Sequence, residues 1–327
     1  MGEILKKINT QYGLNISSSE MVDKGFLSKN YILTGETTKY FLKKYRFNKE
    51  EKIQEIHAAK QYFADGGIPV ILPIVNNVGQ TYFSFEDGYY AIFPCINGRH
   101  IERGNLTEAA TISLGEMLGK MHLRSKKSTL SIQDHFNGWD KGKFIAQAEQ
   151  LISIINAKEK LDEFDINALE GIHIRKELIQ ANTVTFEDLA IPNNCLIQGD
   201  YHDENVFFDE NDHVQYVFDF EKVSYAPRVF ELIRSMMYMF FNETLEIQRI
   251  ELARLYIEVY SKMYPISKEE LQKGLKLHYL RQLHSFWVES EHYINKNYRV
   301  DQFLVGKYKS TQYLSKNLNV LADKLFT

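Results

Sequence analysis

The hydrophobic pattern changes its period near residue 96, and this change limits the folds open to the chain. Before it, short runs of β-branched and aromatic residues alternate with polar turns, which is typical of strands. After it, most apolar residues recur every three or four positions, which is typical of amphipathic helices. We therefore expect a two-lobed α+β fold with a cleft: a small β-rich lobe at 1–95, a hinge at 96–99 and a larger, mostly helical lobe at 100–327.

The first lobe is expected to hold an opening helix, five strands and one inserted helix. The opening helix is indicated by apolar residues at helical spacing, namely Ile4, Leu5, Ile8 and Tyr12. The inserted helix at 49–64 ends before the pair Gly66-Gly67. The strands are expected at 30–34, 39–46, 70–75, 80–85 and 89–95.

The second lobe is expected to be helical except near residues 195–219. There, the short runs CLIQ, NVFF and VQYVFDF have the composition of strands, and the polar turn DEND joins the last two. The expected helices lie at 107–124, 140–157, 161–181, 228–242, 246–262, 267–290 and 300–325.

Composition and charge narrow the class of protein. Hydrophobic residues make up 44% of the chain and charged residues 25%, which is the range of a globular protein. The net charge of −4 gives no reason to expect a nucleic acid as partner. The two cysteines, Cys95 and Cys195, form no disulfide framework, and no apolar run is long enough to span a membrane. We expect a cytoplasmic protein with neither a membrane nor a nucleic-acid partner, and its oligomeric state stays open.

The stretch IQGDYHDENVFF at 197–208 places many polar groups between two apolar runs. Charged groups beside buried strands lose their hydration unless something binds them. The alternative is a surface turn, but the placement between strands favours a functional loop. The residues concerned are Asp200, His202, Asp203, Glu204 and Asn205.

Phosphoryl transfer needs residues of these types at this spacing. One Asp accepts the proton of the substrate hydroxyl, an Asn a few positions on binds metal, and a second Asp binds metal beyond the next hairpin. Asp200 and Asn205 have the spacing DxxxxN, and Asp219 follows in VFDFE, 19 residues after Asp200. Mg²⁺ prefers oxygen ligands and keeps positions for water and phosphate, so one carboxylate and one amide oxygen suit it.

The segments QGDYHDEN and FDFEKVSYAPRVFEL resemble the signature of the aminoglycoside phosphotransferase and choline kinase family, small-molecule kinases that share the protein-kinase-like fold. That signature is His-Gly-Asp, an Asn five residues after the Asp, an apolar strand ending in Asp-Phe-Glu, and Tyr-Gly-Pro before a helix. The resemblance covers most of the chain and is strongest at 195–235. It implies transfer of the γ-phosphate of ATP or GTP, with Mg²⁺, to a hydroxyl of a small polar acceptor such as an aminoglycoside, an amino alcohol or a sugar.

Carried over by position, the resemblance assigns roles to four residues: the catalytic base Asp200, the Mg²⁺ ligands Asn205 and Asp219, and the structural acid Glu231. Two positions depart from the family pattern. Gln198 stands where the family usually has His, and Ala226 stands where it usually has Gly. Because a glutamine amide both donates and accepts hydrogen bonds, Gln198 can brace the loop in place of His.

The resemblance also implies a nucleotide clamp in the first lobe. In KYFLKKYR, strand alternation turns only one lysine toward the cleft, and the apolar-Leu-Lys pattern of the family favours Lys43. Its carboxylate partner is expected on the following helix, with Glu55 preferred to Glu51. The remaining expected contacts are a phosphate-covering loop and an adenine-binding hinge, with the residues Gly25, Ser28, Pro94 and Ile96.

Five residues are candidates for contact with the acceptor, each weighed against a packed or solvated role: His202, Asp203, Glu221, Trp287 and Glu289. Together with Glu204, the acids of this set, Asp203, Glu221 and Glu289, would suit an amine-bearing acceptor. The alternative function is a catalytically silent nucleotide-binding or structural member of the same fold. A protein kinase is disfavoured, because no APE-ended activation segment follows Asp219.

Overall fold

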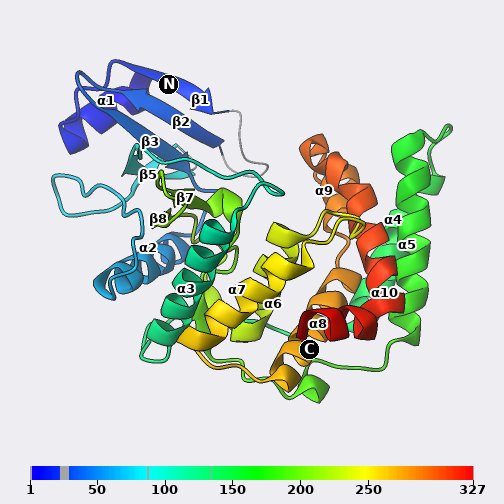
Figure 1. The fold of residues 1–327 in the computed structure, drawn as a ribbon. Coiled ribbons are helices and arrows are strands. Elements are labelled where there is room, and N and C mark those ends of the chain that lie inside the picture. The colour runs from blue at the N-terminus through cyan, green and yellow to red at the C-terminus, as the bar shows by residue number, and fades with distance from the viewer. Residues whose placement is uncertain (1, 23–28, 87, 134, 327) are drawn as a thin grey trace.

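The alternating apolar residues of the first lobe form a five-stranded antiparallel sheet with the strand order β1-β2-β3-β5-β4 (Figure 1). The computed structural model describes residues 2–22, 29–86, 88–133 and 135–326. Two helices flank the sheet, α1 (Gly2–Tyr12) before it and α2 (Glu50–Asp65) after β3. The strands are β1 (Ser18–Val22), β2 (Lys29–Thr34), β3 (Lys39–Lys44), β4 (Phe83–Phe85) and β5 (Gly88–Pro94).

The two faces of this sheet bury different side chains. Leu42 and Ile92 point to the face that α1 covers with Ile4 and Ile8. Their sequence neighbours turn to the opposite face, where Phe93 joins the cluster that contains the apolar residues of α2. Lys43 follows Leu42 and therefore leaves the α1 face, as strand alternation predicts.

The predicted strand at 70–75 is wrong. Val70 makes a single parallel bridge to Val217, and the N–H of Val217 donates to the carbonyl of Pro69 over 2.8 Å. Pro73 lies in the middle of the segment and has no N–H to give to a ladder, which explains why no strand forms. The fifth strand of the sheet is instead β1, which the sequence did not predict, and β4 occupies only the last part of the predicted strand at 80–85.

The second lobe is mainly helical, as predicted. Helix α3 packs on α7, α6 packs on α7 and α8, and α10 packs on α5 and α8 (Figure 1). The helices are α3 (Glu108–Ser125), α4 (Lys141–Asn156), α5 (Glu163–Ala181), α6 (Arg228–Phe240), α7 (Ile250–Met263), α8 (Lys268–Leu283), α9 (Trp287–Tyr293) and α10 (Leu304–Phe326).

One of the predicted helices is divided. The segment 267–290 forms α8 and α9, because the backbone of His284 leaves the helical region with φ −88° and ψ 53°. The N–H of His284 still donates to the carbonyl of Leu280, which closes α8. The break makes Trp287 the first residue of a separate short helix, α9.

The strands embedded in the second lobe form two small antiparallel pairs. The predicted hairpin is β7 (Val206–Phe208) with β8 (Val214–Val217), and β6 (Cys195–Ile197) pairs with β9 (Ser224–Ala226), which the sequence did not predict. Ala226 lies in β9 opposite Cys195 and is fully buried, so this position accepts a methyl group. The third predicted strand stops at Val217, before Asp219, whose φ is +51°.

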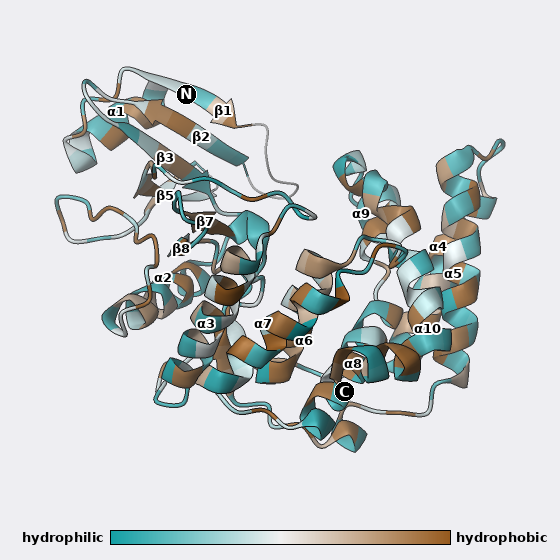
Figure 2. Cartoon of the chain, viewed as in Figure 1, coloured by the Kyte–Doolittle hydropathy of each residue, from teal (hydrophilic) through white to brown (hydrophobic). Residues whose placement is uncertain are grey.

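A continuous hydrophobic core joins the lobes. It extends from Phe63 of α2 through Val217 of the hairpin to Leu232 of α6 and Tyr256 of α7. Figure 2 shows the corresponding pattern, with brown apolar segments on the helices of the larger lobe beside teal polar ones. None of the helices in the described part of the chain is both long enough and apolar enough to cross a membrane. The domain limits at residues 95 and 100 stay predictions.

Candidate active site

Gln198 holds the two functional loops together. Its side chain is fully buried directly after β6. Its Nε2 donates to the carbonyl oxygens of Phe218, at 3.0 Å, and Asp219, and its Oε1 accepts from the N–H of Asp200 at 2.6 Å. One amide therefore fixes the backbone at both acidic residues, which confirms that Gln198 can act as the brace.

Glu231 binds the backbone of the same loop from the start of α6. It lies in the first turn of α6 and is almost fully buried. Its two oxygens accept from the N–H groups of Gly199 and Gln198, the latter at 3.2 Å, and Oε2 lies 2.9 Å from Nε2 of His122. Gly199 is required here: its φ is +88°, and a Cβ would lie 2.1 Å from the carbonyl oxygen of Lys222.

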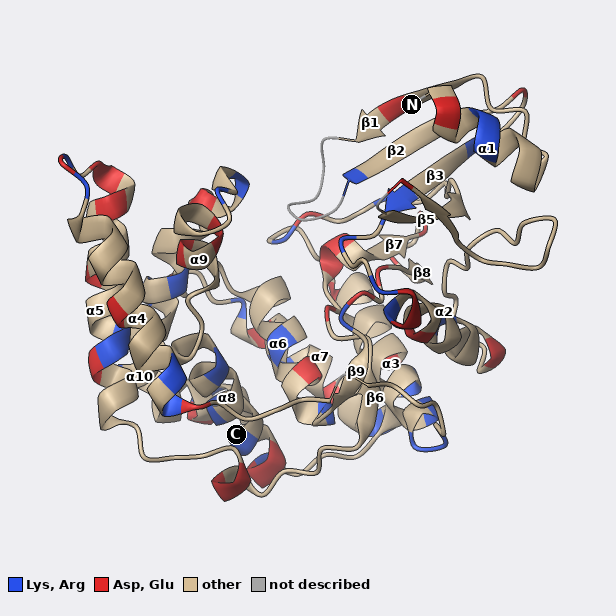
Figure 3. Cartoon of the chain, turned by 180° about the vertical axis from the view of Figure 1, so that it is seen from behind, with Lys and Arg blue, Asp and Glu red and all other residues tan. Residues whose placement is uncertain are grey.

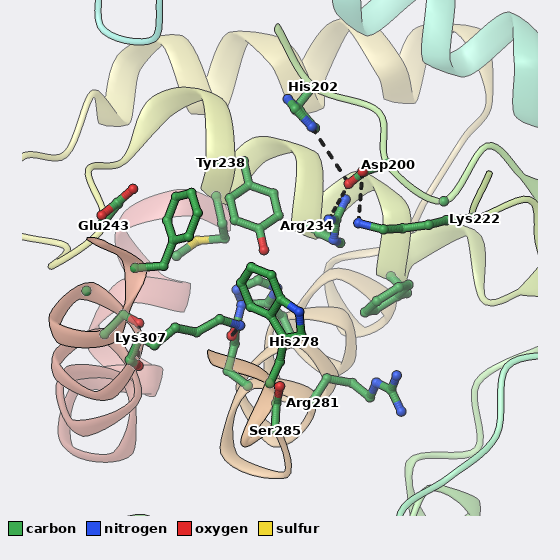
Figure 4. A pocket seen from close by; sticks show the side chains of 18 of the residues that line it. Asp200, His202, Lys222, Arg234, Tyr238, Glu243, His278, Arg281, Ser285 and Lys307 are labelled. Atoms are coloured by element: carbon green, nitrogen blue, oxygen red, sulfur yellow. Dashed lines mark hydrogen bonds and ion pairs between the residues drawn. The ribbon is translucent and has the colours of Figure 1, made fainter. Parts of the chain in front are cut away.

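Asp200 lies between two cations at the wall of a cavity (Figure 4). Its Oδ2 accepts from Nζ of Lys222 at 2.8 Å, and its Oδ1 pairs with Arg234. Burial alone raises the pKa of a carboxyl group, but Arg234 and Lys222 outweigh it and hold the pKa of Asp200 well below its usual range. Asp200 is therefore a carboxylate at neutral pH.

Asn205 and Asp219 present oxygen atoms that suit a hard cation. The Nδ2 of Asn205 donates to the carbonyl of Asp200 at 2.9 Å, and among the described residues its Oδ1 has no hydrogen-bond partner. The Asp219 side chain is 31% exposed, and Lys43 outweighs the effect of burial and lowers its pKa. Within the described residues, no group of three or more His, Cys, Asp or Glu side chains is placed to hold a metal ion by itself. This donor set fits Mg²⁺ with water and phosphate, and it does not fit a structural zinc site.

Lys43 pairs with Asp219 and Glu221, at 3.0 Å and 2.7 Å from Nζ. Burial alone lowers the pKa of Lys43, but these two carboxylates outweigh it and raise the pKa. Glu221 also lies 3.2 Å from Nε of Arg46. Glu221 thus pairs with Lys43 where the sequence expected Glu55, although the sequence placed Glu221 among the acceptor candidates.

The structure does not bring Glu55 to Lys43. The Oε1 of Glu55 accepts from the N–H of Gln133 at 2.7 Å, and Oε2 lies 3.7 Å from Nζ of Lys52. Instead, α2 turns Lys60 inward, where its Nζ lies 4.8 Å from the ring centroid of Phe218. Residues five apart on a helix are rotated by about 140°, so Glu55 and Lys60 cannot share this face.

Two of the acceptor candidates follow Asp200 directly. His202 lines the cavity, with Nε2 3.7 Å from Oδ1 of Asp200, and burial lowers its pKa to about 4, which keeps the ring neutral. Asp203 is buried and does not line the cavity. Burial raises the pKa of Asp203 to about 6.

The cavity beside Asp200 has a volume of about 840 Å³, which is enough for a small molecule. Most of its wall belongs to the larger lobe, where side chains from α6, α8, α9 and α10 line it (Figure 4), and Arg46 of the smaller lobe completes it. Trp287 is one of them, as predicted. Glu289 is not, because it forms a buried ion pair with Arg175, and each side chain is 1% exposed.

The predicted adenine-binding residues lie at the last residue of β5 and just after it. Pro94 pairs in register with Tyr40, and the N–H of Cys95 lies 3.4 Å from the carbonyl of Lys39. Pro94 is exposed, and Ile96 is partly buried against the core. Gly25 and Ser28, predicted for the phosphate-covering loop, lie outside the described residues.

Sequence reasoning missed the two cations that hold Asp200. Lys222 directly follows the DFE motif in the turn before β9, and Arg234 lies three residues after Glu231 on the same face of α6. The position of Lys222 beside the motif and the spacing of Glu231 and Arg234 on one predicted helix were the signals available in the sequence.

A lysine on β3 that pairs with an Asp on a loop of the helical lobe, beside a second loop with an Asp and an Asn, is the arrangement of a protein-kinase-like fold. The chain belongs to the phosphotransferase enzyme family, whose sequence model matches residues 20–266. Together with the two-lobed architecture, this confirms the family and the α+β, kinase-like fold class predicted from the sequence.

Individual relatives are distant. The chain is 26% identical to stress response kinase A of Escherichia coli K12 over 121 residues, which is 36% of each protein, so it spans about a third of that relative. It is 20% identical to a homoserine kinase of Methylobacillus flagellatus over 249 residues, 76% of this chain and 72% of that one. A spectinomycin phosphotransferase crystallised with ADP and spectinomycin has a similar fold, with a TM-score of 0.63, 15% identity and coverage of 100% of this chain and 97% of the other.

Proposed function

We propose that the protein is an ATP- and Mg²⁺-dependent phosphotransferase that moves the γ-phosphate to a hydroxyl of a small molecule. The observation that carries the proposal is the position of Gln198. Its side chain binds the backbone of Asp200, which faces the cavity, and of Asp219, which pairs with Lys43. Family membership and the kinase relatives support the same reaction.

Asp200 orients the acceptor hydroxyl and takes its proton. The acceptor oxygen bonds to the γ-phosphorus while the bond from that phosphorus to the β-phosphate oxygen breaks, which gives a phosphate ester and ADP. Because the pKa of Asp200 is held low, the carboxylate is a weak base toward an ordinary alcohol. Proton transfer becomes favourable as the new P–O bond forms and the hydroxyl turns acidic.

The smaller lobe and the hairpin hold the nucleotide. Lys43, oriented by Glu221, is the cation for the phosphates, and Oδ1 of Asn205 and the Asp219 carboxylate are the protein ligands of the metal. Mg²⁺, when bound, neutralises the charge on the phosphates. Ile96 is the hinge residue that offers adenine a backbone N–H, because Pro94 has none.

A coupled assay of ADP release tests this proposal over a panel of aminoglycosides, amino alcohols, sugars, nucleosides and hydroxy acids. We expect turnover with at least one acceptor, and a loss of about 10²–10⁴-fold in kcat for Asp200→Asn. Turnover that survives this substitution unchanged would contradict the role of Asp200. If no compound turns over while Mg²⁺–ATP still raises the Tm, the catalytically silent alternative is favoured.

A further inference from the structure

The charges around the cavity do not fit the amine-bearing acceptor that the sequence suggested. Of the acids considered for that role, Asp203, Glu221 and Glu289 do not line the cavity, and Glu204 lines it but is exposed. Beside Asp200, the only other acid on the described walls is Glu243, which is also exposed. Cations are more numerous, and the lysines and arginines that line the cavity are Arg46, Arg103, Lys222, Arg234, Arg281 and Lys307.

Three of these cations already have carboxylate partners near the phosphate side of the site. Arg46 pairs with Glu221, and Lys222 and Arg234 pair with Asp200. For the other three, Arg103, Arg281 and Lys307, no ion pair with a described carboxylate is formed. Of these, Lys307 projects from α10 into the part of the cavity away from Asp200 (Figure 4).

The direct contacts of Lys307 are with uncharged groups, although the charges of Arg175, Arg234 and Glu289 also act on it. Its Nζ donates to Oε1 of Gln282 at 2.6 Å and lies 6.0 Å from the ring centroid of Trp287. The side chain is partly buried, and burial lowers its pKa. A partly buried ammonium group that is paired with no carboxylate is available to bind an anion.

The pKa values of two neighbours of Lys307 indicate a positive electrostatic potential in this part of the cavity. Burial alone raises the pKa of Tyr238, yet Arg234, Lys307 and Lys222 lower it to about 8. Burial lowers the pKa of His278 to about 3, and Arg234 and Lys307 act in the same direction, so the ring is neutral. Figure 3 shows blue basic segments on α6, α8 and α10, the helices that surround this part of the cavity.

We propose that the acceptor is a small hydroxylated anion whose carboxylate or phosphate group binds Lys307 while its hydroxyl reaches Asp200. This inference rests on the proposed function, because it assigns the acceptor of the same reaction. Arg281 is exposed at the mouth of the cavity, with its guanidinium 4.8 Å from the ring of Phe136, and adds to the attraction of an anion. Trp287 offers an apolar surface to the carbon skeleton of the acceptor.

Binding measured without turnover tests the inference separately from the reaction. Calorimetry and thermal shift are run with glycerate and 3-hydroxybutyrate as carboxylates, with glycerol 3-phosphate and glucose 6-phosphate as phosphates, and with ethanolamine and ribose as probes without an anionic group. The variants are Lys307→Met, which keeps the length of the side chain, and Lys309→Met, at an exposed position two residues further along α10.

We expect at least one anion to bind the wild type and Lys309→Met, and the Kd to rise about 10-fold or more in Lys307→Met. The carboxylate and phosphate arms show which anionic group is preferred. Without ligand, Lys307→Met should raise the Tm, because it removes an unpaired ammonium; a purely structural lysine would lower it.

Three results would overturn the inference: no anion binds the wild type, the anions bind Lys307→Met equally well, or ethanolamine binds more tightly than every anion. Acceptor turnover measured by ADP release keeps the two proposals apart. Turnover of an uncharged or amine-bearing acceptor without anion binding leaves the proposed function standing and removes the anionic acceptor. Anion binding that depends on Lys307 without any turnover supports the anion site and counts against the reaction.

Discussion

Gln198→Leu tests whether one buried amide holds the two loops of the site. Leucine has a similar size but cannot form hydrogen bonds, so the substitution leaves the N–H of Asp200 and the carbonyls of Phe218 and Asp219 without their partner. Each buried polar group left unpaired costs about 1–3 kcal/mol, so the free energy of unfolding should fall by about 3–9 kcal/mol. For a chain of this size, that corresponds to a Tm lower by roughly 4–13 °C.

Activity should fall as well, because the loops that carry Asp200 and Asp219 lose their common anchor. A displacement of about 1 Å at a reacting group costs roughly 100-fold in rate, so we expect a loss of that order in kcat. Thermal unfolding and ADP release are measured for Gln198→Leu, and for Gln272→Leu at an exposed position of α8 as the control.

A second variant, Gln198→His, tests whether hydrogen bonding by the side chain at this position, and not its size alone, maintains the site. A neutral imidazole has one donor and one acceptor, so it should restore part of both stability and kcat. The reasoning is refuted if Gln198→Leu melts within about 2 °C of the wild type and keeps its kcat, since the loss of three buried hydrogen bonds predicts a larger change.

Three further predictions concern positions around the same loops. Burial raises the pKa of Asp203 to about 6 from its usual 3.8, so its contribution to stability is present below pH 3.8 and is lost as the pH rises through 6. This amounts to about 3 kcal/mol, and Asp203→Asn should flatten the difference between urea midpoints measured at about pH 4.5 and pH 8. Glu221→Gln should raise the KM for the nucleotide about 10-fold, whereas Glu55→Gln should leave it nearly unchanged; equal effects in steady-state kinetics would contradict the pairing of Lys43 with Glu221. Gly199→Ala should lower the free energy of unfolding by more than about 2 kcal/mol, because it combines a positive φ with a backbone clash, and an unchanged denaturation midpoint would argue against the loop geometry.

Much of the fold could be predicted from sequence because periodicity reports burial directly. The opening helix, the helix α2 and the β7–β8 hairpin follow from local patterns, and the structure has them close to the predicted limits. The segment at 70–75 failed because its apolar run satisfied the pattern of a strand while Pro73 prevented the ladder. The break between α8 and α9 carries no glycine or proline, so no local signal marked it.

The candidate site was predictable only where the chain brings residues together locally. Asp200 and Asn205 share one loop, and the hairpin returns Asp219 to them. The partner of Lys43 depended on which face of α2 meets β3, and that is decided by tertiary packing, which turned Lys60 inward in place of Glu55. The charge of the cavity depended on helices more than a hundred residues away from Lys43, and no sequence pattern linked them.

The central claim is that Asp200, Asn205 and Asp219 act around one metal–nucleotide complex. Its most direct test is a crystal structure with AMP-PNP and Mn²⁺, in which anomalous scattering at the manganese edge locates the metal. We expect an anomalous peak at about 2.2 Å from both Oδ1 of Asn205 and the carboxylate of Asp219, with the γ-phosphate on the side of Asp200. Bound nucleotide with manganese at other residues, or a peak that contacts neither side chain, would contradict the account.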